Sequence, residues 1–128
     1  MKPKLILTLS SLIYFLRAFG LIFAPMKLFE MYGITLDRIG EWNGQFLGAI
    51  LLGIGILNWL VRELPDDYML RRILIANLFL DGASFIFSLK GTLNGLFGSA
   101  GWAPTIQHLI FVVLFGMLLL RKKATDVH

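Results

Sequence analysis

Cysteine is absent from this chain of 128 residues. Without a thiol, the chain cannot form disulfides, thiolate metal sites, iron–sulfur clusters or a cysteine nucleophile. Histidine is scarce as well, and His108 and His128 lie too far apart in the sequence to make a zinc site by themselves. We therefore expect no metal centre of these kinds.

Charge is also scarce. Only 16% of the residues are charged, 57% are hydrophobic, and the mean hydropathy is +0.76, a balance that favours lipid over water as the solvent. The net charge of +4 does not indicate a nucleic-acid partner, because the basic residues cluster at the ends of hydrophobic runs instead of forming one stripe. The composition predicts an integral membrane protein.

Four hydrophobic runs are long enough to cross a bilayer as helices, namely residues 5–24, 42–61, 71–89 and 104–120. The first run, with its basic start, could also be a secretory signal, but Arg17 inside it and the lack of a cleavage site favour a retained helix. The sequence thus predicts an all-α fold, a four-helix transmembrane bundle that forms a single domain over residues 1–128.

The connections between these runs differ in character. Residues 26–32 form a short amphipathic segment, predicted to lie in the membrane interface. Residues 63–67 form a tight polar turn around Pro65. Residues 91–103 hold four glycines and no charge, which predicts an apolar loop without helical structure, beginning where Lys90 and Gly91 end the third run.

Orientation follows from the lysines and arginines on each side of the bundle. Eight flank the predicted N-terminal side: Lys2, Lys4, Arg62, Arg71, Arg72, Arg121, Lys122 and Lys123. Three flank the other side: Lys27, Arg38 and Lys90. We therefore expect a multi-pass protein of the cytoplasmic (inner) membrane with both termini in the cytoplasm.

Polar residues inside the third run share one helical face, because Asn77, Asp81, Ser84 and Ser88 are spaced by 4, 3 and 4 residues. At about 1.5 Å of rise per residue, Arg17 of the first run lies at a depth similar to that of Asp81. Either charge alone is costly in hydrocarbon, so the sequence predicts a buried Arg17–Asp81 pair. Such a pair either fixes the register of two helices or contacts a ligand.

Small residues mark the second run. Gly44, Gly48 and Gly55 lie on one face, and Gly53 forms a small-xxx-small pair with Ala49 beside it. Such faces predict close helix packing, either within this bundle or against another subunit. A phosphate-binding glycine loop is excluded, since no strand and no Gly-Lys-Ser/Thr motif accompanies these glycines.

A polar pocket in the outer half of the membrane is a further possibility. Its candidate members are Arg17, Glu41, Gln45, Asp81, Ser84, Gln107 and His108. Such a pocket would suit the head of a quinone or a lipid, although each polar group could instead hydrogen-bond to a neighbouring helix. His108 could also ligate a haem or a chlorophyll axially.

A resemblance to a known family lies in the segment 15–60. Within it, Leu-Arg-Ala-Phe-Gly-Leu-Ile-Phe-Ala-Pro ends at Pro25, Tyr-Gly-Ile ends at Ile34, and Trp-Asn-Gly-Gln-Phe-Leu-Gly ends at Gly48. This segment resembles small bacterial four-span proteins of the DoxX-like type. The resemblance implies a four-span fold and, for some members, a link to quinone-coupled sulfur redox chemistry. The lack of cysteine here speaks against thiol chemistry.

Two functions remain open. Small size, minimal loops and glycine-rich faces favour a non-catalytic accessory or scaffold subunit that binds other membrane subunits or a second copy of itself. The alternative is a DoxX-like protein that binds a quinone, lipid or pigment and supports a redox enzyme. Catalysis by the chain itself is unsupported, because Asp81 is the only acidic residue within the membrane and no nucleophile–base spacing occurs.

Overall fold

The computed structural model describes residues 2–65 and 67–121, and within these ranges it contains helices and no strand. The elements are α1 (Pro3–Phe23), α2 (Pro25–Glu30), α3 (Arg38–Val61), α4 (Tyr68–Leu93), the short 3₁₀ helix η1 (Ser99–Gly101) and α5 (Trp102–Leu120). α1, α3, α4 and α5 are long and apolar enough to cross a membrane, which confirms the predicted all-α four-helix bundle. Lys122, Lys123 and His128 lie outside the described residues.

Two helices begin earlier than predicted because aspartates cap them. The Asp37 carboxylate accepts a hydrogen bond from the Gly40 N–H at 2.7 Å, so α3 starts at Arg38 and not near residue 42. The Asp67 carboxylate accepts from the N–H groups of Met69 and Leu70 at 2.9 and 3.2 Å. The hydrophobic runs mark only the part of each helix that crosses hydrocarbon, whereas the caps set the true starts.

α4 also ends later than predicted, since Lys90 and Gly91 are still helical. Gly95 adopts a φ of +72° just after the helix, and its N–H donates to the Thr92 carbonyl while the Leu96 N–H donates to the Gly91 carbonyl. This is the Schellman arrangement, which requires a left-handed residue that glycine supplies at little cost. The predicted loop 91–103 is therefore partly helical, at its start and again in η1.

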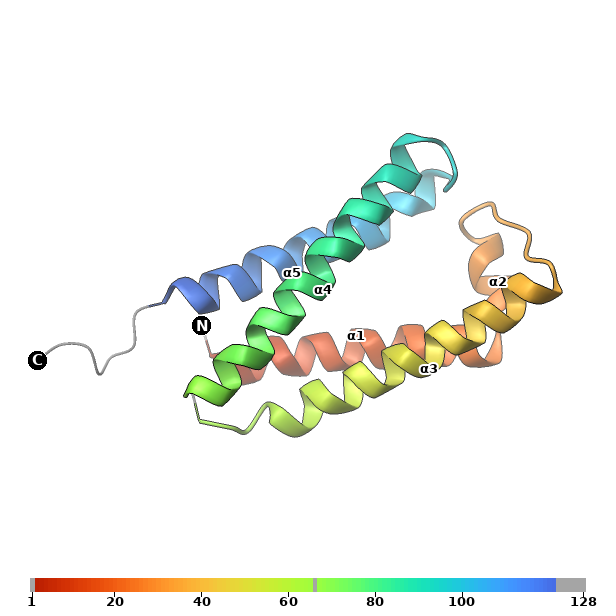
Figure 1. Ribbon diagram of the computed structural model, residues 1–128. Helices are drawn as coiled ribbons and strands as arrows, with labels where there is room; N and C mark the ends of the chain where they lie inside the picture. Colours follow the sequence, from red (N-terminus) through yellow and green to blue (C-terminus); the bar gives the residue numbers. More distant parts are fainter. Residues whose placement is uncertain (1, 66, 122–128) are drawn as a thin grey trace, which may run out of the picture.

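The four long helices form two antiparallel hairpins, α1 with α3 and α4 with α5 (Figure 1). The hairpins converge at the end that carries the N-terminus and diverge toward the end that carries α2. We call the first the closed end and the second the open end.

Apolar packing fills the closed end. Its core consists of Ile6, Leu7, Leu70, Leu74, Phe111, Phe115 and Leu118, all buried. Above this core the two hairpins are joined by polar contacts, because the side-chain amides of Asn58 and Asn77 exchange hydrogen bonds at 2.8 and 2.9 Å and Asn58 also donates to the Ser10 hydroxyl at 3.1 Å. In hydrocarbon each such bond is worth roughly 0.6 to 1.7 kcal/mol, so the amide pair fixes the register of α3 on α4.

The glycines of α3 fall into two groups. A Cβ on Gly48 would lie 2.9 Å from side-chain atoms of Leu21 and Ile22 and 3.1 Å from the Ala18 carbonyl oxygen, so α1 can pack this closely only against glycine. Gly55 is buried in the same interface, against Phe15 and Tyr14 of α1, whereas Gly44 is buried against Pro25 and Phe29 of α2. Gly53 differs, because nothing lies within 4 Å of its Cβ position, and this face points away from the bundle.

Candidate ligand-binding cavity

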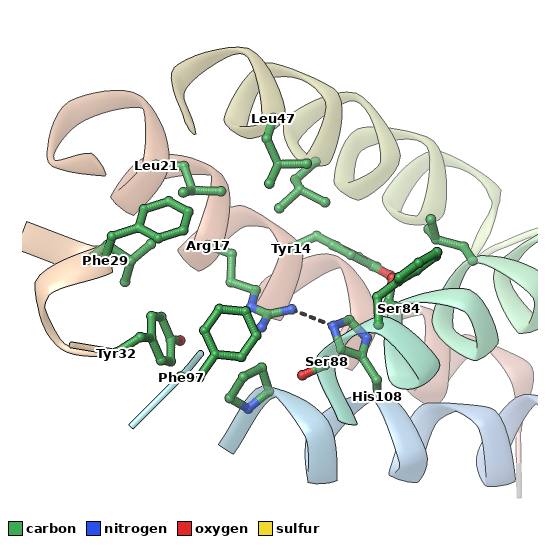
Figure 2. Close-up of a pocket in the computed structure, with 15 residues that line it drawn as sticks. Tyr14, Arg17, Leu21, Phe29, Tyr32, Leu47, Ser84, Ser88, Phe97 and His108 are labelled. Carbon is green, nitrogen blue, oxygen red and sulfur yellow. Dashed lines mark hydrogen bonds between the residues drawn. The ribbon is translucent and has the colours of Figure 1, made fainter. Parts of the chain in front are cut away.

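A cavity of about 340 Å³ lies between the two hairpins where they diverge (Figure 2). All five α-helices and both connections at the open end contribute to its wall. The lining residues are Tyr14, Arg17, Leu21, Leu28, Phe29, Tyr32, Leu47, Leu51, Leu80, Ser84, Phe87, Ser88, Phe97, Pro104 and His108. The wall is mainly apolar and aromatic with a few polar groups, which is the usual composition of a small-molecule site.

The connections of the two hairpins meet at the far end of this cavity. The Gly98 N–H donates to the Tyr32 carbonyl at 2.9 Å, and the Tyr32 and Phe97 rings pack edge to face with centroids 6.1 Å apart. The Phe97 ring lies over Gly91, which has no side chain to obstruct it. These contacts tie the tips of the hairpins together, so the cavity is bounded at both its ends.

A chain of hydrogen bonds crosses between the hairpins at the base of the cavity. Arg17 of α1 reaches His108 of α5 with a guanidinium nitrogen 2.9 Å from Nε2 (Figure 2). The other ring nitrogen of His108, Nδ1, lies 2.8 Å from Oδ1 of Asp81 on α4, and the Tyr14 hydroxyl donates to the same oxygen at 3.3 Å. Three of the four spanning helices are thereby linked through one imidazole.

Donor and acceptor chemistry fixes the protonation of this chain. A guanidinium has only donors, so Nε2 of His108 must accept and carries no proton. The proton of the neutral imidazole then sits on Nδ1 and donates to the Asp81 carboxylate. The cavity base consequently holds one positive charge on Arg17 and one negative charge on Asp81, with a neutral histidine between them.

Asp81 is fully buried and stands behind the lining residues. Its Oδ1 accepts two hydrogen bonds, whereas its Oδ2 has no partner in the described part of the chain. An oxygen that accepts two donors suits an ionised carboxylate, and the Arg17 charge one imidazole away compensates it.

The predicted Arg17–Asp81 contact therefore needs a correction. Among the described residues no direct ion pair joins the two side chains, because the His108 ring lies between them. The rise along each helix placed Arg17 and Asp81 at a similar depth, but the sequence did not indicate that α5 inserts the His108 imidazole between them.

The other predicted pocket residues divide clearly. Ser84 lines the cavity, together with Arg17 and His108. Glu41, Gln45 and Gln107 do not: the exposed Gln45 amide donates to the Ile22 carbonyl at 3.3 Å, Glu41 is half-buried near the start of α3, and the Gln107 amide nitrogen is buried without a partner among the described residues. These three residues lie near the ends of their spans, as predicted, but on helix faces that do not line the cavity.

Sequence reasoning missed the aromatic part of the wall. Phe29, Tyr32 and Phe97 lie in the connections, where aromatic residues are expected at the interface and give no sign that they fold back over a cavity. The sequence does point to Tyr14 as a cavity residue, since it shares a helical face with Arg17. Ser88, on the same face as Asp81, hydrogen-bonds to the Thr105 hydroxyl at 2.8 Å and so joins α4 to α5.

His108 has no free ring nitrogen with which to ligate a haem or a chlorophyll axially. Nε2 faces Arg17 and Nδ1 faces Asp81, so a metal would have to displace the guanidinium. Within residues 2–65 and 67–121, no three metal-ligating side chains gather at one point.

Comparison with known proteins identifies no relative of this chain: no family model, no curated protein and no solved structure matches it. The geometry of the cavity is therefore the main guide to the function of the protein.

Proposed function

We propose that this protein binds a small amphiphilic molecule of the membrane, a quinone or a lipid, with the polar head at the base of the cavity. The observation that carries the proposal is the placement of Arg17 and His108 at the base of a mainly apolar cavity between two hairpins. Polar groups in hydrocarbon are costly, and their convergence on one hollow is typical of a binding site.

The shape and lining of the cavity support this class of ligand. A volume of about 340 Å³ is at the lower end of the range for small-molecule sites and suits a single ring with its substituents. The Phe29, Tyr32 and Phe97 rings provide flat apolar surfaces, and Ser84 adds a hydroxyl. A quinone-binding role in support of a redox enzyme would also agree with the proposed DoxX-like kinship.

We propose further that the closed end faces the cytoplasm, so that the protein is an inner-membrane protein with its cavity in the outer half. Lys4, Arg62 and Arg71 lie at the closed end, and Arg62 stacks over the Trp59 ring at 3.5 Å, as expected of a basic aromatic interface. A membrane-impermeant maleimide applied to intact cells should label a Lys27→Cys variant and spare a Lys4→Cys variant. The reverse labelling would refute this orientation.

A stability assay tests ligand binding. The protein in lipid nanodiscs would be titrated with decylubiquinone, which should raise the melting temperature by several degrees, because a ligand at about 100 times its Kd adds about 2.7 kcal/mol. Ser84→Leu fills part of the cavity and should abolish the shift. The neighbouring Ala83→Leu, on the exposed face of α4, should retain it. No shift in the natural protein, or an equal shift in both variants, would refute quinone binding at this site.

The scaffold role is a second candidate, supported by the face of α3 around Ala49 and Gly53. Ala49 is exposed, and the Gly53 Cβ position has open space around it, so another helix could approach closely there. Particle mass after extraction in a mild detergent would test this role. A monomer with no companion subunit would count against it and leave the binding proposal intact.

A further inference from the structure

We infer that the occupant of the cavity has an uncharged head with hydrogen-bond acceptor oxygens, and that it reaches the cavity sideways from the hydrocarbon, between α3 and α4. This inference rests on the proposed binding function and specifies its ligand class and its route.

The charge balance at the cavity base favours an uncharged head. The Arg17 charge is already compensated by Asp81 through the neutral His108 ring. An anionic head would add a net negative charge in a low-dielectric site, whereas a cationic head would face Arg17 with no carboxylate among the lining residues. A neutral head leaves the balance unchanged.

The free hydrogen-bond donors of Arg17 favour a head with acceptor oxygens. Arg17 has five N–H donors, and the contact with His108 uses a single nitrogen. The guanidinium therefore keeps donors for the cavity, while the acceptor Nε2 of His108 is occupied. A ligand that accepts, such as one with a ketone, quinone or ester carbonyl, fits this surplus of donors.

The exposure of two cavity-lining residues indicates the route into the cavity. Leu47 of α3 and Phe87 of α4 both line the cavity, and they are 43% and 71% exposed. The core closes one end of the cavity, and the Tyr32–Phe97 contact bridges the other. α3 and α4 belong to different hairpins, are joined at the Asn58–Asn77 pair and diverge toward the open end (Figure 1), so the route that we infer runs between them on the open side of this pair.

A matched pair of probes tests the head group. Methyl tridecyl ketone and tetradecyl sulfonate have chains of similar length, but only the sulfonate carries a charge. At low mole fraction in nanodiscs, the ketone should bind at least about tenfold more tightly, a difference of about 1.4 kcal/mol. Tighter binding of the sulfonate would overturn the inference and leave the proposed function standing. Binding of neither probe, nor of decylubiquinone, would overturn the proposed function itself.

Asp81→Asn sharpens this test, because it removes the compensating charge and leaves Arg17 free to attract an anion. The variant should shift its preference toward the sulfonate, at least about tenfold relative to the natural protein. An unchanged preference in a folded variant would contradict the charge argument. If Asp81→Asn does not fold, the selectivity of the natural protein still decides the question.

The absence of native cysteine allows a direct test of the route. A single thiol in Phe87→Cys should react with N-ethylmaleimide several-fold more slowly when the ketone is bound, because the chain of the ligand then passes over it. Phe79→Cys, on α4 but outside the cavity and 75% exposed, is the matched control and should react at an unchanged rate. Equal protection of both thiols, or of neither, while the ketone is bound would refute a path between α3 and α4.

Discussion

Removal of the two charges at the cavity base, singly and together, tests the Arg17–His108–Asp81 chain most directly. Arg17→Met leaves the Asp81 carboxylate buried without a compensating charge, and Asp81→Asn leaves the guanidinium in the same position. Breaking a buried ion pair by removing one partner costs about 3 to 5 kcal/mol. Each single variant should therefore lose about that much of its free energy of unfolding.

The double variant should be more stable than either single variant. In it both charges are gone, the Nδ1–H of His108 can still donate to the asparagine carbonyl, and only Nε2 loses its donor, at a cost of about 1 to 3 kcal/mol. Independent effects would instead add to about 6 to 10 kcal/mol. The structure thus predicts a coupling energy of at least about 3 kcal/mol between two residues that do not touch.

Unfolding in mixed micelles with increasing SDS, followed by loss of helical circular dichroism, would measure these differences. The matched control is the pair Lys4→Met and Glu63→Gln, whose ion pair of 2.8 Å is exposed to solvent at the closed end and should show little coupling. A double variant at Arg17 and Asp81 that loses the sum of the single losses would refute the bridged chain.

Two further perturbations follow from the structure. Gly48→Ala forces α1 and α3 apart and should destabilise the protein by about 1 to 3 kcal/mol, whereas Gly53→Ala meets open space and should be neutral or slightly stabilising, as melting in nanodiscs would show; equal effects would contradict the assigned packing face. The hydrogen bond from Lys4 lowers the pKa of the Glu63 carboxyl. The small stabilising effect of this hydrogen bond is therefore fully present above the usual glutamate pKa of about 4.3, and it is lost as the pH falls through the lowered pKa of Glu63. Glu63→Gln should flatten that part of the acid titration of stability, and an unaltered profile would argue against the contact.

Much of the fold could be predicted from local patterns. The hydrophobic runs gave the number of spanning helices, since only an apolar helix of about 20 residues crosses hydrocarbon with its backbone satisfied. The 4, 3 and 4 spacing from Asn77 to Ser88 identified the inward face of α4, and Gly48 and Gly55 marked the close approach of α1 and α3. Helix ends were less accessible, because capping by Asp37 and Asp67 depends on single side chains and not on periodicity.

The sequence by itself determined that this chain has four helices long and apolar enough to cross a membrane and that a polar face turns inward, because hydropathy and helical period are properties of consecutive residues. The tertiary structure alone decided that the helices pair as two diverging hairpins and leave a cavity between them. It also placed the His108 ring between Arg17 and Asp81, and Phe97 opposite Tyr32. Such contacts join residues far apart in the chain, and they depend on the angle at which whole helices cross, which no local pattern encodes.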